Sequence, residues 1–133
     1  MQNFLHLAKS RRSVREYLPD KIPKADIEKI IEAGNCAPSA MNLQPLRYFV
    51  LDQKVEIQKA SQIYLEIRRK YIPDLIERAV PDPVFYQAPV VVFICAEKGL
   101  SPYADRDAML ALQNCLLQAR EMGCGPAVAP DGG

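Results

Sequence analysis

An arginine-rich segment near the N-terminus contains residue types that could bind a charged ligand. It reads Arg11, Arg12, Ser13, Val14, Arg15, so three guanidinium groups and a hydroxyl lie within five residues. A guanidinium presents a planar fork of donors that matches phosphate oxygens. In an extended chain Arg11, Ser13 and Arg15 point to the same side. The segment could therefore hold a phosphate group, and the alternative is a solvated basic turn after a helix.

A second segment, residues 37–45, combines two prolines with small and carboxamide side chains. Asn42 and Gln44 each offer a donor and an acceptor, which suits an imide edge or the hydroxyls of a polyol chain. The small residues around Pro38 and Ser39 would let a ligand approach the backbone. The alternative is an ordinary loop between a helix and a strand, in which Asn42 and Gln44 bond to their own backbone.

Two carboxylates, Asp105 and Asp107, lie where a long helix is expected to begin. Paired carboxylates can serve as general acid and base. Their place in the first turn favours capping and interaction with the helix dipole instead. Further along this helix, Gln113 and Asn114 are expected to be exposed or bonded at a subunit contact.

The remaining reactive side chains give no sign of a metal site or of a catalytic triad. The cysteines stand at 36, 95, 115 and 124 without a Cys-x-x-Cys pair, and the single histidine is His6. Zinc sites need paired ligands at short spacing. We therefore expect that the protein binds no metal and that its thiols are free and mostly buried, in a reducing cytoplasm. Any chemistry should then depend largely on a cofactor.

Composition narrows the class of protein. The chain has 133 residues, 49% apolar and 25% charged, with a formal net charge of +1. These values suit a single domain, residues 1–133, and give no overall field that would attract nucleic acid. The longest apolar run, residues 88–96, falls far short of the ~20 residues of a membrane span. We expect a cytoplasmic protein that binds neither nucleic acid nor membrane.

The elements that must position these segments can be read from periodicity. Helices are expected at 3–8, 24–33, 55–71, 74–79 and 104–122, and strands at 46–51 and 89–95. Gly34 and Gly123 should end the second and last helices. The strand at 89–95 is apolar throughout, as in a central strand buried on both faces. The last helix should turn four apolar residues inward, Met109, Leu112, Leu116 and Ala119. This order predicts an α+β fold in which helices pack on a small central sheet, mixed or antiparallel.

Three segments together resemble the nitroreductase family of flavoproteins. They are RRSVREYLPDKIPKADIEKIIEAGNCAPSAMNLQPLRYFVL, the strand APVVVFICA, and the helix DAMLALQNCLLQAREMGCG with its glycine-rich exit. The resemblance covers residues 3–125 in the family's order. It implies an α+β homodimer with FMN at the subunit interface and NAD(P)H as electron donor. The chain also looks short at its C-terminus, where family members continue.

The resemblance also implies roles for individual residues. Arg11, with Arg12 beside it, matches the contact to the FMN phosphate, and Ser13 matches a hydroxyl contact to the phosphate or ribityl chain. Arg15 matches the basic residue near N1 and O2 of the flavin. The loop that the partner subunit contributes would present four cofactor-binding residues, Pro38, Ser39, Asn42 and Gln44.

The implied reaction is ping-pong transfer of electrons from NAD(P)H through the flavin to a nitroaromatic, a quinone or a similar small acceptor. The chemistry would be centred on the flavin, with no catalytic side chain. Two alternatives remain open at this point. One is a relative with other flavin chemistry, such as dehalogenation or flavin fragmentation, and the other is a non-catalytic flavin-binding or interaction module.

Overall fold

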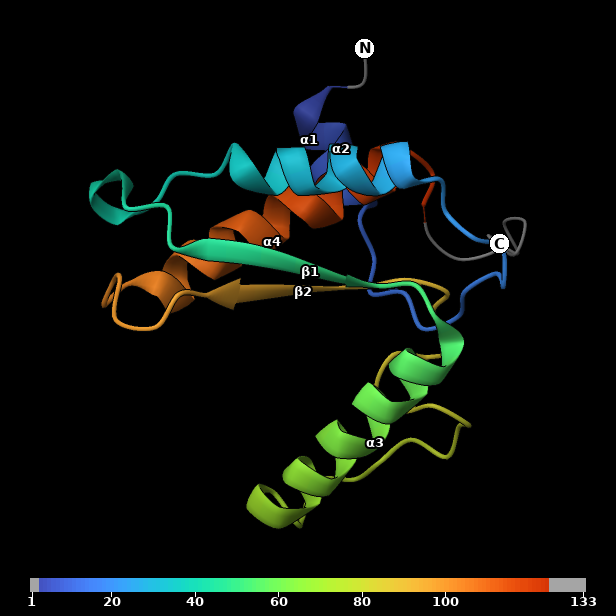
Figure 1. Ribbon diagram of the computed structural model, residues 1–133. Coiled ribbons are helices and arrows are strands. Elements are labelled where there is room, and N and C mark those ends of the chain that lie inside the picture. Colours follow the sequence, from blue (N-terminus) through green and yellow to red (C-terminus); the bar gives the residue numbers. More distant parts are fainter. Residues whose placement is uncertain (1–2, 125–133) are drawn as a thin grey trace. The chain divides into compact units, whose positions relative to one another are not determined.

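The structure is a computed structural model that describes residues 3–124. Its helices are α1 (Phe4–Ser10), α2 (Lys24–Asn35), α3 (Lys54–Tyr71) and α4 (Ala104–Glu121), with a 3-10 turn η1 (Ala40–Asn42) (Figure 1). Strands β1 (Leu46–Leu51) and β2 (Val91–Ala96) form a two-stranded sheet. The strands are antiparallel, because the amide that follows β2, at Glu97, donates to the carbonyl that precedes β1, at Pro45 (2.8 Å). The predicted α+β fold is confirmed, and of the two kinds of sheet left open, mixed or antiparallel, the structure has the antiparallel one.

The chain divides into two compact units. Of the described residues, the first unit comprises 3–13, 22–49 and 92–124 and contains α1, α2 and α4. The second comprises 14–21 and 50–91 and contains α3. None of the helices in the described part of the chain combines the length and the apolar composition that crossing a membrane requires.

The first unit is built on the packing of α2 against α4, with α1 also resting on α4. Its buried side chains include Ile27 of α2 and Cys115 of α4. Gly34 was expected to end α2, but it lies inside the helix, which continues to Asn35. A Cβ at this position would lie 2.6 Å from the hydroxyl oxygen of Tyr48 and 2.7 Å from Sγ of Cys115. Gly34 therefore permits close packing and does not terminate the helix.

The buried face of α4 differs from the expected one. Its buried residues are Asp107, Ala111, Cys115 and Leu117. Met109, Leu112 and Leu116, which we expected inside, are 62%, 37% and 41% exposed. Small side chains at Ala111 and Cys115 on the inner face allow close packing of the helix, and the three larger apolar residues that we expected inside are left outside. The end of α4 is as expected, with Gly123 in the left-handed region (φ 71°). Gly125, the last residue of the expected exit, lies outside the described residues.

The second unit contains α3 and the long connection to β2. Ile57 and Ser61 are buried on α3. The prediction of a short helix over 74–79 is wrong. Residues 73 and 74 form a turn, and residues 75–78 have no regular secondary structure. Arg69 instead bonds the Glu77 carboxylate through Nε and Nη2 (2.9 and 3.0 Å), which ties the stretch to the end of α3. Pro73 also disfavours continuation of the helix.

Two expectations of burial are also wrong. The strand β2 was expected to be buried on both faces, but Val91–Ile94 are only half-buried and Cys95 is exposed. Cys36 is exposed as well, whereas Cys115 is buried and Cys124 half-buried, so the thiols are not mostly buried. Within residues 3–124, β2 pairs with β1 alone, which leaves its other edge without a neighbouring strand.

Candidate functional site

The basic segment begins where α1 ends. Arg11 is the C-terminal cap of α1 and has extended backbone (φ −63°, ψ 136°). The guanidinium of Arg12 turns back to this helix end, where its Nη1 donates to the carbonyls of Lys9 (2.6 Å) and Arg11 (2.9 Å). Arg11 is half-buried, and Arg12 and Ser13 are exposed. These three residues belong to the first unit.

Arg15 belongs to the second unit and is exposed. It does not pair with its neighbour Glu16, and within residues 3–124 none of Arg11, Arg12 and Arg15 forms an ion pair. Burial raises the pKa of the nearby Tyr17 phenol, while the positive charge of Arg15 acts in the opposite direction. The structure therefore leaves three guanidinium charges uncompensated in the basic segment.

The second candidate segment forms a tight loop from α2 to β1. The hydroxyl Oγ of Ser39 accepts from the Gln44 amide (3.0 Å), and Nε2 of Gln44 donates to Oδ1 of Asn42 (2.9 Å). The two carboxamides thus bond to each other, where the simpler alternative had each bonding to its own backbone. Pro38, Asn42 and Gln44 are exposed, and Ser39 is half-buried. The loop ends at Pro45, a fully buried residue that anchors it to the sheet.

The backbone of this loop is strained. Met41, Asn42 and Gln44 have φ values of 54°, 54° and 49°, in the left-handed region that residues other than glycine rarely adopt. Each such residue costs on the order of 1–2 kcal/mol. Strain of this kind persists where the surroundings hold the backbone, and it is common at ligand-binding sites.

The contact that links the loop to α4 comes from Asp107, which the sequence had suggested as a helix cap. The α4 cap position is Tyr103, and no side chain among residues 3–124 caps this helix end. Asp107 is only 4% exposed, and its Oδ1 accepts from the Ala40 amide at the start of η1 (3.1 Å). The capping prediction is therefore wrong for Asp107. Its partner lies 67 residues away in sequence, so local patterns gave no signal for this role.

Two hydrogen bonds join α4 to α2, the helix that precedes the loop. Nδ2 of Asn114 donates to the Ala33 carbonyl (3.0 Å), which satisfies Asn114 inside the chain. The thiol of Cys115 donates to the Ile30 carbonyl (3.4 Å). Burial raises the pKa of the Cys115 thiol and, together with the nearby Cys115, that of Tyr48. Both groups therefore remain neutral at physiological pH.

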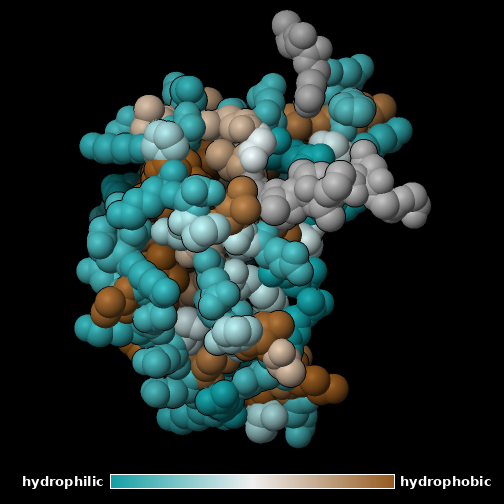
Figure 2. Space-filling model, turned by 90° about the vertical axis from the view of Figure 1, so that its right-hand side faces the viewer, coloured by the Kyte–Doolittle hydropathy of each residue, from teal (hydrophilic) through white to brown (hydrophobic). Residues whose placement is uncertain are grey.

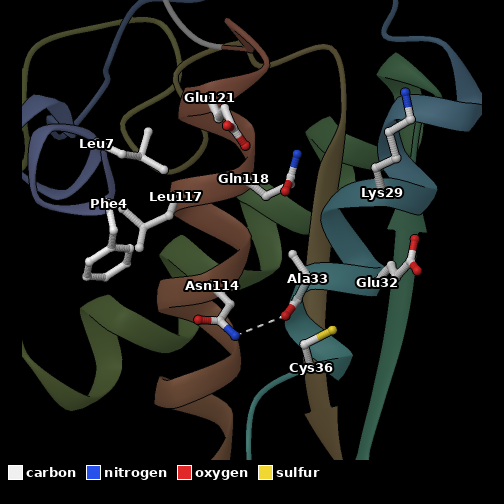
Figure 3. Close-up of a pocket in the computed structure, with 10 residues that line it drawn as sticks. All are labelled: Phe4, Leu7, Lys29, Glu32, Ala33, Cys36, Asn114, Leu117, Gln118 and Glu121. Atoms are coloured by element: carbon white, nitrogen blue, oxygen red, sulfur yellow. Dashed lines mark hydrogen bonds between the residues drawn. The ribbon is translucent and has the colours of Figure 1, made fainter. Parts of the chain in front are cut away.

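An open cavity of about 430 Å³ lies between α1, α2 and α4 (Figure 3). The apolar side chains of Phe4, Leu7 and Leu117 line one part, and the charged groups of Lys29 and Glu32 line another. None of the eight predicted cofactor-binding residues lines this cavity. Within residues 3–124, no group of three or more histidine, cysteine or acidic side chains is placed to hold a metal ion.

The sequence model of the nitroreductase family matches residues 8–128, which is most of the chain. The chain belongs to the nitroreductase family. A crystal structure of a nitroreductase with bound FMN from Bacteroides fragilis superposes on this family member with a TM-score of 0.81 and 26% identity. The superposition covers 92% of this chain and 67% of that one.

Curated relatives of this nitroreductase-family chain carry two kinds of name. A protein of Archaeoglobus fulgidus, 31% identical over 94% of this chain, has the provisional name NADH dehydrogenase/NAD(P)H nitroreductase. A protein of Thermotoga neapolitana, 29% identical over 98% of this chain and 76% of its own length, is named iodotyrosine deiodinase. The chain spans 66% of the length of the Archaeoglobus relative and 57% of a second archaeal one.

Proposed function

We propose that this chain is an FMN-dependent oxidoreductase that takes electrons from NAD(P)H and passes them to a nitroaromatic, a quinone or a similar acceptor by a ping-pong mechanism. Family membership supports the class of reaction. The observation that carries the proposal to this chain is a set of three guanidinium groups, at Arg11, Arg12 and Arg15, that form no ion pair with any residue of 3–124.

The donors and acceptors present fit the parts of FMN. Arg11, Arg12 and the hydroxyl of Ser13 supply positive charge and a hydrogen-bonding group for a phosphate. Arg15 supplies a cation for the pyrimidine edge, where negative charge develops on reduction. Asn42 and Gln44 retain polar atoms beyond the bond between them, which suits an imide edge or ribityl hydroxyls. When bound, FMN supplies two-electron transfer between the donor and the acceptor.

The loop of residues 38–44 is proposed to serve the cofactor site of a second subunit. The support for a dimer is the apolar stripe of α4, where Met109, Leu112 and Leu116 follow one another at helical spacing and are exposed. Figure 2 shows hydrophobic residues at the surface among hydrophilic ones on one face of the molecule. An unpartnered apolar stripe on a core helix suits burial against another copy of the chain.

A titration of the purified protein with FMN, followed by flavin fluorescence, tests the proposal. Arg11→Ala should weaken binding about ten- to hundredfold, the loss expected for one charge-assisted contact of ~1.5–3 kcal/mol. The matched control is Lys98→Ala, which removes a charge from an exposed turn outside every candidate segment. Equal effects of the two substitutions would favour the solvated basic turn, and wild-type protein that binds no FMN would refute the proposal.

Reductive dehalogenation is the second candidate function, because the Thermotoga relative named iodotyrosine deiodinase aligns over 98% of this chain. The third is a non-catalytic flavin-binding module, in which FMN binds to the same segments without a reaction. A screen of the FMN-loaded protein against nitroaromatics, quinones and halogenated phenols separates these candidates. Turnover of nitroaromatics or quinones with NAD(P)H supports the main proposal, and turnover of halogenated phenols alone supports the second. FMN binding without any turnover supports the third.

A further inference from the structure

We propose that Asp107 is a positioning residue that holds the Ser39–Gln44 segment in the conformation that presents Asn42 and Gln44 to the cofactor. This inference rests on the proposed function, because it assigns a purpose to the loop of that same site. Asp107 itself lies on α4 and holds the loop through its hydrogen bond with the Ala40 amide.

The geometry of the carboxylate favours a role in placing the loop over a role in general stability. Asp107 is 4% exposed, and its Oδ1 accepts one hydrogen bond from the described residues, from the Ala40 amide at 3.1 Å. The other oxygen, Oδ2, is buried and has no hydrogen-bond partner within the described residues. A buried carboxylate with one oxygen unsatisfied is costly, and an apolar side chain of similar volume would commonly be as stable there. An apolar side chain could not accept a hydrogen bond from the Ala40 amide, so this bond is the specific contribution of the carboxylate.

The amide that bonds to Asp107 belongs to Ala40, the first residue of the strained turn η1. Ala40 opens η1, and its carbonyl accepts from the Leu43 amide (3.2 Å). Directly after it, Met41 and Asn42 adopt the left-handed region. A turn of this kind is unfavourable in a free chain, so it needs external contacts that hold it. Asp107 on α4 provides such a contact from the helix core of the same unit, and Ser39 closes the turn by bonding the Gln44 amide.

The expected consequence of losing this contact is a loop that samples other conformations. Asn42 and Gln44 would then have to be ordered when FMN binds, and the affinity would fall by the cost of that ordering. The remaining contacts of α4 with α2, such as the bond from Asn114 to Ala33, would stay in place. The effect of Asp107 should therefore be local to residues 39–44.

Hydrogen exchange of the protein without added FMN, measured by mass spectrometry, tests the local effect. Asp107→Ala should raise the exchange rate of the amides in 39–44 at least tenfold. The matched control is Asn114→Ala, which removes another hydrogen bond between α4 and a backbone group but leaves 39–44 protected. Asp107→Asn keeps an oxygen that can accept from Ala40 and should restore protection to within threefold of wild type. If Asp107→Ala does not fold, a loss of protection in Asp107→Asn overturns the proposal.

An FMN titration of the same proteins tests the functional consequence. Asp107→Ala should raise the dissociation constant of FMN tenfold or more, whereas Asp107→Asn and Asn114→Ala should change it by less than threefold. Unchanged exchange in 39–44, or equal affinities of Asp107→Ala and Asn114→Ala, would overturn the positioning role. Wild-type protein that binds no FMN would refute the proposed function, while the exchange measurement would still decide whether Asp107 holds the loop.

Discussion

At the scale of single residues, Arg15 is the side chain most directly open to a mechanistic test. It is exposed and forms no ion pair within residues 3–124. A guanidinium at the N1 and O2 edge of FMN would stabilise the reduced cofactor more than the oxidised one. Arg15→Gln should therefore lower the two-electron potential of bound FMN by a few tens of millivolts, where ~30 mV corresponds to ~1.4 kcal/mol.

The measurement for Arg15 is a potentiometric titration of wild type and variant at the same pH and salt concentration. Arg12→Gln is a suitable control, because it removes the same charge from a side chain that bonds to the end of α1 and is assigned to the phosphate end of FMN. An unchanged potential in Arg15→Gln, with FMN still bound, would place Arg15 away from the pyrimidine edge.

The packing around Gly34 makes a second prediction at this scale. A Cβ at residue 34 would approach Tyr48 and Cys115 to 2.6 and 2.7 Å, so Gly34→Ala should lower the free energy of unfolding by about 1–3 kcal/mol. This loss should outweigh the ~1 kcal/mol that alanine gains over glycine in a helix. Urea unfolding followed by circular dichroism measures the change.

The control for Gly34 uses the hydroxyl of Tyr48, which is buried and has no hydrogen-bond partner within residues 3–124. Tyr48→Phe alone should leave stability unchanged or raise it, because it removes an unsatisfied buried group. Combined with Gly34→Ala, it should recover part of the lost stability, since the clash with Cys115 remains. A Gly34→Ala protein more stable than wild type would contradict this account of α2.

At the scale of elements, Asp82 organises the connection between α3 and β2. Burial alone would raise the pKa of Asp82, but hydrogen bonds from the Ser61 hydroxyl and from the amides of Phe85, Gln87 and Val84 outweigh it. The net effect is a pKa below the ordinary value of 3.8. A carboxyl whose pKa is lowered by folding contributes stability above its unfolded pKa and loses that contribution as pH falls through its folded pKa.

We therefore predict that the ionised Asp82 stabilises the second unit at neutral pH and ceases to do so in acid. Asp82→Asn should be less stable than wild type near pH 7, and the difference should shrink as pH falls from about 4 toward 2. Urea unfolding of both proteins across this range measures the difference. A gap that stays constant down to pH 2 would show that the charge of Asp82 is not the source of its effect.

At the scale of the whole molecule, the exposed apolar stripe of α4 predicts self-association. Size-exclusion chromatography with light scattering should give about twice 14.9 kDa. Replacing Met109 and Leu116 together by lysine should shift the protein toward the monomer, because a charge buried in an interface is strongly unfavourable. A stable dimer of this kind often buries more than ~2,000 Å².

The control for the dimer places the same two charges on another helix. Gln58 and Gln62 are exposed polar residues of α3, and their replacement by lysine should leave the mass unchanged. Wild-type protein that is monomeric at micromolar concentration would remove the model in which the loop of residues 38–44 completes a partner's site. Equal effects of the two double variants would exclude α4 as the interface.

Whether a helical periodicity marks the inside or the outside of a helix depends on what packs against it. The sequence predicted the extent of α4 to within one residue, but it assigned Met109, Leu112 and Leu116 to the core. Apolar periodicity identifies an apolar face, yet the smaller residues Ala111 and Cys115 are the buried ones, and Cys115 contacts Gly34 and Ile30 of α2. The helix therefore has apolar residues on two faces, and only the tertiary structure decides which of them is covered within the chain.

By itself, the sequence determined the α+β fold class and the family, because these depend on local residue patterns. The segments that it assigns to a cofactor stay a prediction. Strand β1 was predicted with its observed bounds, Leu46–Leu51. Only the tertiary structure decided that Gly34 permits close packing inside α2, that Glu77 returns to Arg69, and that Asp107 holds the Ala40 amide. These contacts join residues that are far apart in sequence, from 8 positions for Arg69 and Glu77 to 81 positions for Gly34 and Cys115. No local periodicity encodes such a pairing.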